Sequence, residues 1–211
     1  MSKSQPSFTT LPGLKYLPGF FTPEAQKELV TALLFAAEEA PFYTPVMPRS
    51  GRPFSVRMTN LGPLGWVSDR VGYRYQAMHP ETGRPWPAMP ERLFALWRQV
   101  SDYPHPPEAC LVNLYREGAK MGLHRDEDEE DFSAPVVSVS LGDTAIFRIG
   151  GLARGGKTET LKLGSGDVLV MGGPSRLRYH GIDRVLAASS TLVPGGGRIN
   201  LTLRRVRKPR L

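Results

Sequence analysis

The second half of the chain is a series of short apolar or alternating runs, each ended by glycine, aspartate or serine. These runs lie at residues 110–115, 136–141, 145–149, 160–163, 168–171, 177–180 and 199–203. Many short strands at such spacing are typical of a β-sandwich or a jelly roll. The pattern therefore predicts a mainly β fold from about residue 109 to residue 205.

The first half of the chain has a different texture. Thr22, Pro23 and Glu24 make a helix start, with a hydroxyl cap, a proline in the first turn and an early acid. Apolar residues follow at helical spacing to about residue 39, and a second helix is predicted over residues 90–100. Residues 41–90 contain nine prolines, so we expect loops and short edge strands between the helices.

Charge is unevenly distributed along the 211 residues. The chain has 27 Lys and Arg against 20 Asp and Glu, a net charge of +7, yet six of the 20 acids are consecutive at residues 126–131. A basic protein with one acidic segment favours an anionic partner and a bound cation. The alternative is a solvated acidic turn among ordinary surface charges.

Sequence features also bear on location. No stretch approaches the roughly 20 consecutive apolar residues of a membrane helix, and the N-terminus has no apolar core of a secretory signal. Cys110 is the only cysteine and cannot form an internal disulfide. We therefore expect a cytoplasmic, reducing setting and no membrane partner.

Two histidines and one aspartate form a candidate metal site. His124 and Asp126 are two residues apart, so in an extended segment they project to the same face. His180 follows on a later predicted strand. Two histidines and one carboxylate with open positions are the ligand set of non-haem iron(II) oxygenases. The alternative is that the pair arose by chance and that His180 is an ordinary core or surface residue.

The last predicted strand carries two arginines on one face. Ile199, Leu201 and Leu203 are apolar, so the even-numbered residues Arg198 and Arg204 share the opposite face with Asn200. A buried arginine needs an anionic partner, and its planar fork matches a carboxylate, so a dicarboxylate co-substrate fits. Pairing with internal acids, or exposure to solvent, is the alternative.

Aromatic and basic residues interleave between residues 66 and 86. Such aromatic faces among cations are typical of proteins that bind a single strand or a flipped base. A core role is the alternative, and it is favoured for Trp86, which is flanked by prolines. The residues are Trp66, Arg70, Tyr73, Arg74, Tyr75, Arg84 and Trp86.

Together these motifs resemble the AlkB family of iron(II)- and 2-oxoglutarate-dependent dioxygenases, which repair alkylated bases. The resemblance covers about residues 20–205. It is carried by Asn113-Leu114-Tyr115, His124-Arg125-Asp126-Glu127-Asp128, Ser138-Val139-Ser140-Leu141-Gly142, Tyr179-His180-Gly181 and Arg198-x-Asn200-Leu201-Thr202-x-Arg204.

The resemblance implies a role for each matching residue. The implied iron ligands are His124, Asp126 and His180. The implied 2-oxoglutarate residues are Asn113, Leu114, Tyr115, Arg198, Asn200 and Arg204. The implied substrate residues are Trp66 for stacking, Tyr73, Arg74 and Tyr75 for the backbone, Asp128 for the damaged base, and Thr160. Two positions depart from the family: Met171 replaces a familiar tryptophan, and Thr160 stands near a familiar basic contact.

The resemblance also implies the fold and the reaction. The fold is a double-stranded β-helix, or jelly roll, at residues 109–205. It is preceded by an arm (1–21) and a helical and nucleotide-recognition extension (22–108), and followed by a basic tail (206–211). With Fe(2+), 2-oxoglutarate and O2, the enzyme would remove methyl groups from base nitrogens such as those of N1-methyladenine and N3-methylcytosine. Formaldehyde, succinate and CO2 are the products.

The expected partner is alkylated DNA, single- or double-stranded, with RNA as a further candidate, and the expected state is a monomer. Two alternatives stay open. The same chemistry could act on RNA, protein or a small molecule, or the chain could be a catalytically inactive nucleic-acid-binding module.

Overall fold

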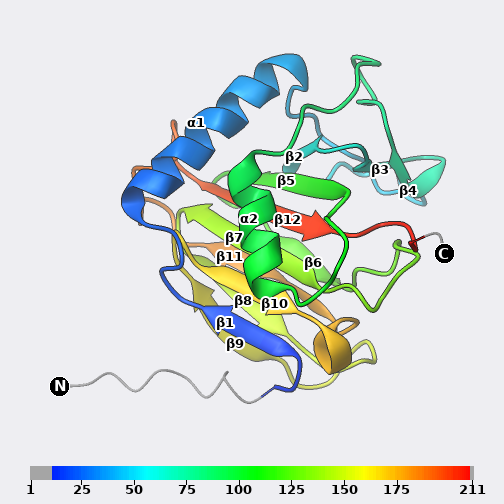
Figure 1. Cartoon of the computed structure of the whole chain (residues 1–211), viewed down its shortest axis with the longest axis vertical. Coiled ribbons are helices and arrows are strands. Elements are labelled where there is room, and N and C mark those ends of the chain that lie inside the picture. The colour runs from blue at the N-terminus through cyan, green and yellow to red at the C-terminus, as the bar shows by residue number, and fades with distance from the viewer. Residues whose placement is uncertain (1–10, 210–211) are drawn as a thin grey trace.

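The computed structural model describes residues 11–209 and confirms the predicted jelly roll (Figure 1). Two antiparallel sheets enclose an apolar interior. The larger sheet has the order β1 (Leu14–Leu17), β10 (Val168–Met171), β7 (Val136–Gly142), β12 (Arg198–Arg204), β5 (Ala109–Tyr115) and β2 (Arg57–Leu61). The smaller sheet has the order β6 (Met121–His124), β11 (His180–Val185), β8 (Ala145–Ile149) and β9 (Glu159–Leu163).

Both predicted helices are present and cover the outer face of the larger sheet (Figure 1). Helix α1 (Pro23–Glu39) begins where the Thr22 hydroxyl accepts a hydrogen bond from the amide of Ala25 at 3.3 Å. Helix α2 (Glu91–Val100) follows Pro90. Their buried side chains pack against the outward-facing residues of β5, β7, β10 and β12. Neither helix has the length and apolar character needed to cross a bilayer.

The predicted alternation of β12 decides where its polar residues point. Ile199, Leu201 and Leu203 belong to the core under the helices. Arg198 and Arg204 lie on the other face of the strand and line the interior between the two sheets. Because β12 is central in its sheet, both arginines are buried.

One difference from the sequence-based expectations concerns the strand predicted at residues 177–180. Strand β11 begins only at His180, because a turn and an irregular segment occupy residues 176–179, after the 3-10 turn at Gly173–Ser175. Strand β1, assigned to the arm, and β2, assigned to the extension, are the two edge strands of the larger sheet. Residues 1–10 of the arm and 210–211 of the tail lie outside the described residues.

A separate hairpin stands beside the two sheets, formed by β3 (Gly65–Asp69) and β4 (Gly72–Gln76) (Figure 1). Its Trp66 lies opposite Tyr75 in the ladder, and Ser68 lies opposite Tyr73. The hairpin comes from the proline-rich region, where short strands are expected. It carries most of the aromatic residues that the sequence singled out.

Candidate active site

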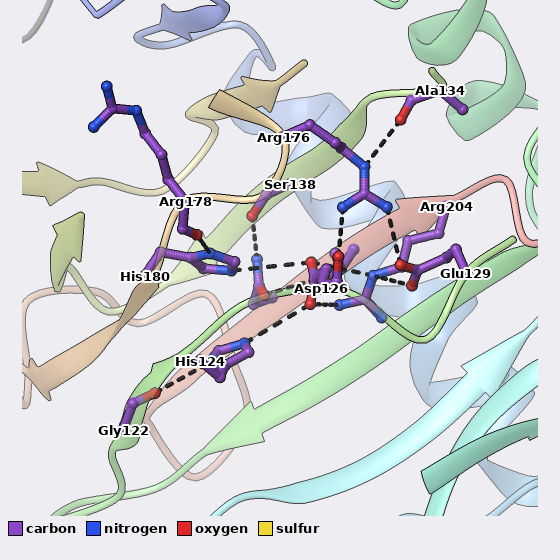
Figure 2. A network of polar contacts seen from close by, with 12 residues as sticks. Gly122, His124, Asp126, Glu129, Ala134, Ser138, Arg176, Arg178, His180 and Arg204 are labelled. Atoms are coloured by element: carbon purple, nitrogen blue, oxygen red, sulfur yellow. Dashed lines mark hydrogen bonds and ion pairs between the residues drawn. The ribbon is translucent and has the colours of Figure 1, made fainter. Parts of the chain in front are cut away.

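His124, Asp126 and His180 converge between the two sheets (Figure 2). His124 ends β6 and His180 begins β11, and these two residues are paired in the ladder. The Nε2 atoms of His124 and His180 each lie 3.9 Å from a different carboxylate oxygen of Asp126. One ligand atom from each residue lies within 4.8 Å of the others. The triad therefore has the spacing of a set of ligands around one metal ion.

Hydrogen bonds orient both imidazole rings. Nδ1 of His124 lies 2.9 Å from the carbonyl of Gly122, and Nδ1 of His180 lies 3.0 Å from the carbonyl of Arg178. A carbonyl can only accept, so each Nδ1 carries the proton and each Nε2 presents a lone pair to the site. Burial, with the neighbouring His124, lowers the pKa of His180 to about 4. Its ring is therefore neutral at pH 7, the form that binds a metal.

Asp126 is held ionised although it is buried. Burial opposes its ionisation, but the positive charge of Arg204 outweighs this and keeps the pKa of Asp126 below its ordinary value. Nη2 of Arg204 donates to one carboxylate oxygen at 2.8 Å, and its Nε donates to the other at 3.3 Å. Arg204 thus presents the carboxylate to the two histidines.

Only half of the acidic run is solvated, as the alternative interpretation has it: Glu127, Asp128 and Glu130 are exposed. Asp126, Glu129 and Asp131 are buried, with 7%, 5% and 8% of their surface exposed. Glu129 forms an ion pair with Arg176 at 2.9 Å and another with Arg204 at 3.4 Å. Sequence reasoning missed both Glu129 and Arg176, because burial of selected acids within a run of six leaves no signal in the chain itself.

A cavity of about 740 Å³ opens from the triad between the sheets. This is within the range of small-molecule sites, about 300–1,000 Å³. The guanidinium of Arg198 lies in the wall of this cavity, and 1% of the residue is exposed. Nη2 of Arg198 donates to the hydroxyl of Ser140 at 2.9 Å. Its Nε and Nη1 have no hydrogen-bond partner among the described residues. A buried cation without a counter-ion fits an anionic ligand, which is the chemistry expected of a dicarboxylate co-substrate site.

Other residues expected around 2-oxoglutarate also line this cavity. Asn113 and Tyr115 of β5 face it, and the Tyr115 ring lies 5.2 Å from the Arg198 guanidinium. The side chain of Asn200 is held by the Ser138 hydroxyl at 2.8 Å. Leu114 is different: alternation along β5 turns its side chain into the core under the helices, so it does not line the cavity.

Trp66 of β3 and Asp128 meet where the cavity opens to solvent. The indole Nε1 of Trp66 donates to Asp128 at 2.7 Å. Tyr73 stacks on Trp66, with ring centroids 5.5 Å apart, and is 51% exposed. An aromatic face, a carboxylate and an exposed tyrosine therefore share one rim. Trp86 is buried beside Tyr43, as its core interpretation predicts.

Three residues expected to contact substrate point elsewhere. Arg74 forms a bidentate ion pair with Asp69, at 3.0 and 2.8 Å, across the hairpin. Tyr75 turns its hydroxyl toward Glu129 and Arg204. Thr160 is exposed on β9, opposite Arg148, and does not line the cavity. Strand alternation explains the orientations of Arg74 and Thr160, because neighbouring residues project to opposite faces. Tyr75 shares a face of β4 with Tyr73, and its direction is instead set by the contact of its hydroxyl with Glu129.

Arg154, which sequence reasoning missed, lines the cavity from the loop between β8 and β9. The loop is rich in glycine and carries Arg154 and Lys157, a composition that could have indicated a phosphate contact. Met171, the departure from the family pattern, is buried at the end of β10 and also lines the cavity.

A jelly roll that presents two histidines and one carboxylate to a cavity with a buried cation defines the class of non-haem iron oxygenases. Residues 13–204 match the family model of the 2OG-Fe(II) oxygenase superfamily. The chain is 58% identical over 199 residues to an alpha-ketoglutarate-dependent dioxygenase AlkB homolog of Caulobacter vibrioides, covering 94% of this chain and 90% of that one. It is 45% identical over 192 residues to alpha-ketoglutarate-dependent dioxygenase AlkB of Escherichia coli, covering 89% and 88%.

The solved structure of OsALKBH1 superposes with a TM-score of 0.76 at 33% identity, covering 92% of this chain and 99% of that one. The chain belongs to the AlkB family within the 2OG-Fe(II) oxygenase superfamily. It is an iron(II)- and 2-oxoglutarate-dependent dioxygenase that uses O2.

Proposed function

We propose that this dioxygenase repairs DNA by removing methyl groups from base nitrogens, with N1-methyladenine and N3-methylcytosine as its substrates. The observation that carries the proposal is one cavity with three parts: the histidine–aspartate triad, the unpaired buried Arg198, and the rim formed by Trp66 and Asp128. When bound, iron with 2-oxoglutarate and O2 supplies the oxidation of the methyl carbon, which leaves as formaldehyde, with succinate and CO2 as co-products.

The protein's own residues bind and orient the reactants. His124, Asp126 and His180 would hold iron. Arg198 would pair with the carboxylate of 2-oxoglutarate far from the metal, since its free Nε and Nη1 are the unmatched donors of the cavity. Arg204 would contact the carboxylate nearer the metal. Asn113, Tyr115 and Asn200 would complete this site.

The rim has the chemistry to select a cationic base. Methylation at N1 of adenine or N3 of cytosine gives the ring a positive charge. Trp66 offers an aromatic face for stacking, and its hydrogen bond fixes Asp128 beside that face. A carboxylate about 4 Å from a cationic ring is worth up to about 4 kcal/mol at an effective dielectric near 20. Tyr73 and Arg154, both lining the cavity, would contact the nucleic-acid backbone.

The test compares four methylated oligonucleotides, with the lesion at N1 of adenine, N3 of cytosine, N1 of guanine or N3 of thymine. Demethylation is followed by mass, and the first two, which are cationic, should be the better substrates. Asp128→Asn should lower kcat/KM on the two cationic lesions more than on the two neutral ones. A uniform loss, or no loss, would contradict the role of Asp128.

An RNA substrate is the second candidate, because a fission yeast relative, 28% identical over 249 residues, is named tRNA demethylase abh1. Assaying each lesion in RNA and DNA of the same sequence separates the two.

We further propose that the enzyme acts as a monomer in the cytoplasm. One chain supplies every residue of the proposed site, and its single cysteine, which cannot form an internal disulfide, suits a reducing compartment. Light scattering would test the monomer.

A further inference from the structure

The substrate-binding hairpin is attached at two points to the acidic segment, residues 126–131. Trp66 of β3 donates to Asp128, and the hydroxyl of Tyr75 of β4 donates to Glu129. Asp128 faces the cavity opening, whereas Glu129 is buried. The second attachment therefore reaches from the hairpin into the interior of the site.

Glu129 is the meeting point of three donors. Its carboxylate accepts from Arg176 at 2.9 Å and from Tyr75, and Nε of Arg204 lies 3.4 Å away. Its side chain is 1% exposed. Burial raises the pKa of Tyr75 well above its ordinary value, so the hydroxyl keeps its proton and can donate. Rearranging any of these groups would leave a buried charge or donor without a partner.

Arg176 anchors this arrangement from the other side (Figure 2). Its Nη1 donates to the carbonyl of Asp126 at 2.7 Å, and its Nε donates to the carbonyl of Ala134 at 3.0 Å. Glu129 is therefore fixed to the segment that carries the metal ligand. Tyr75 is the member of the group that belongs to the hairpin, and Nη1 of Arg204 points to its hydroxyl oxygen at 3.5 Å.

We propose that Glu129, held by Arg176 and Tyr75, is a positioning residue for Arg204, and that Tyr75 thereby couples base binding on the hairpin to 2-oxoglutarate binding. The inference rests on the proposed function, which assigns the base to Trp66 and a carboxylate of 2-oxoglutarate to Arg204. It adds that the two ligands bind cooperatively, and it names the residues responsible.

The sign of the coupling follows from the contacts. A base bound on the hairpin restricts the motion of β4 and with it the Tyr75 hydroxyl, which fixes Glu129 and therefore Arg204. The 2-oxoglutarate that binds next has less ordering to impose, so the cooperativity is positive. Linkage requires the effect to be reciprocal: 2-oxoglutarate must tighten oligonucleotide binding by the same factor.

The experiment measures 2-oxoglutarate binding by calorimetry to protein loaded with Mn²⁺, which holds the site without turnover. Each titration is done with and without a short oligonucleotide containing N1-methyladenine. In the wild-type protein the oligonucleotide should lower the Kd for 2-oxoglutarate by at least about fivefold, the lower range of allosteric coupling. In Tyr75→Phe this ratio should fall to near one.

The matched control is Tyr103→Phe. Tyr103 donates to Asp131, another buried acid of the same segment, at 2.6 Å, but it does not contact Glu129 or Arg204. Tyr103→Phe removes the same kind of hydrogen bond as Tyr75→Phe. It should leave the ratio of the Kd values for 2-oxoglutarate, without and with the oligonucleotide, at its wild-type value. A general effect of loosening the acidic segment would instead lower the ratio in both variants and would overturn the proposal.

Glu129→Asp tests the same link from its other end. It keeps the charge but shortens the side chain by one methylene group, so the ratio should again fall toward one. The proposal is overturned if the wild-type ratio is one, or if both Tyr75→Phe and Glu129→Asp keep the wild-type ratio. Failure of the wild-type protein to bind 2-oxoglutarate or the oligonucleotide at all would contradict the proposed function instead.

Discussion

Two buried arginines on one strand face have opposite energetic roles. Arg204 is paired with Asp126 and Glu129 in the structure, whereas Arg198 has no carboxylate partner among the described residues. A buried charge without a partner is costly to the folded state, so Arg198 is retained at the expense of stability. This is typical of a residue that serves a ligand, since functional sites often break the rules that favour folding.

Replacing Arg198 with methionine should therefore separate function from stability. Arg198→Met should raise the 2-oxoglutarate requirement about 10- to 100-fold, the equivalent of roughly 1.5–3 kcal/mol for a charge-assisted contact. Without 2-oxoglutarate its Tm should equal or exceed that of the wild-type protein. Succinate formation and thermal unfolding measure the two effects.

The matched variant is Arg204→Met, which leaves the buried carboxylate of Asp126 without its arginine partner and should cost about 3–5 kcal/mol of stability. If Arg198→Met were destabilised as much as Arg204→Met, the assignment of Arg198 as an unpaired ligand-binding cation would be wrong.

Cys110 gives a pH dependence that can be measured. Burial raises the pKa of its thiol from 9.0 to about 12. The unfolded chain releases this proton near pH 9 and the folded chain does not, so the free energy of unfolding falls as pH rises between 9 and 12. From pH 8 to pH 10.5 the thiol should contribute a loss of about 2 kcal/mol.

Urea unfolding at the two pH values, compared with Cys110→Ala, isolates this contribution from that of the other titrating groups. The variant should show the smaller loss of stability. Equal losses in both proteins would mean that the thiol ionises as readily in the folded chain as in the unfolded one.

At the scale of elements, the hairpin β3–β4 is joined to the rest of the protein mainly by side-chain contacts. It forms its own two-stranded sheet, and a hairpin of this size is marginal in isolation. Asn60 of β2 supports it by accepting from the amide of Trp66 at 3.0 Å and donating to its carbonyl at 3.0 Å. The hairpin thus carries Trp66 on a sheet of its own, held to the rest of the protein by contacts such as those of Asn60.

Trp66→Ala should weaken oligonucleotide binding by roughly 1–3 kcal/mol, the value of one base–aromatic stack. Turnover of 2-oxoglutarate without a nucleic-acid substrate should persist, because the metal ligands come from β6, β11 and the segment after β6. Fluorescence anisotropy and succinate release measure the two effects. Loss of both activities to the same extent would indicate that Trp66 supports the fold rather than the base.

At the scale of the whole molecule, four arginines pair with buried acids. Arg205, and Arg207 of the basic tail, pair with the buried Glu108, at 3.4 and 2.5 Å. Arg176 and Arg204 balance Asp126 and Glu129. These arginines are not free to contact nucleic acid, and Arg198, which has no carboxylate partner among the described residues, lies in the cavity.

Ligand binding at that cavity should stabilise the whole chain. Mn²⁺ with 2-oxoglutarate at about 100 times its Kd should add about 2.7 kcal/mol, or roughly 5–10 °C in Tm for a chain of this size. Chelation of the metal with EDTA should remove most of the shift, since the triad and Arg198 share one cavity. Arg198→Met is the control: with an affinity about 10- to 100-fold weaker, the same concentration of 2-oxoglutarate should add only about 0.4–1.4 kcal/mol. A full shift in that variant would place the co-substrate elsewhere.

The sequence alone determined the local features of this protein. Alternation in β12 placed Arg198 and Arg204 opposite an apolar face, because side chains in a strand have a period of two. The Thr22 cap fixed the start of α1, and the triad residues came from motif spacing and the family resemblance. Each of these depends on residues close in the chain or on a recognisable pattern.

Only the tertiary structure decided which charges meet. Glu129 lies beside Arg176 and Arg204, 47 and 75 positions away in the chain, and nothing in a run of six acids marks which of them become buried. The same holds for the hydroxyl of Tyr75, which turns inward to Glu129. It also holds for Arg154, which lines the cavity, whereas Thr160 does not. Burial and pairing are properties of how strands and loops pack together, so they follow from the folded arrangement and not from local sequence.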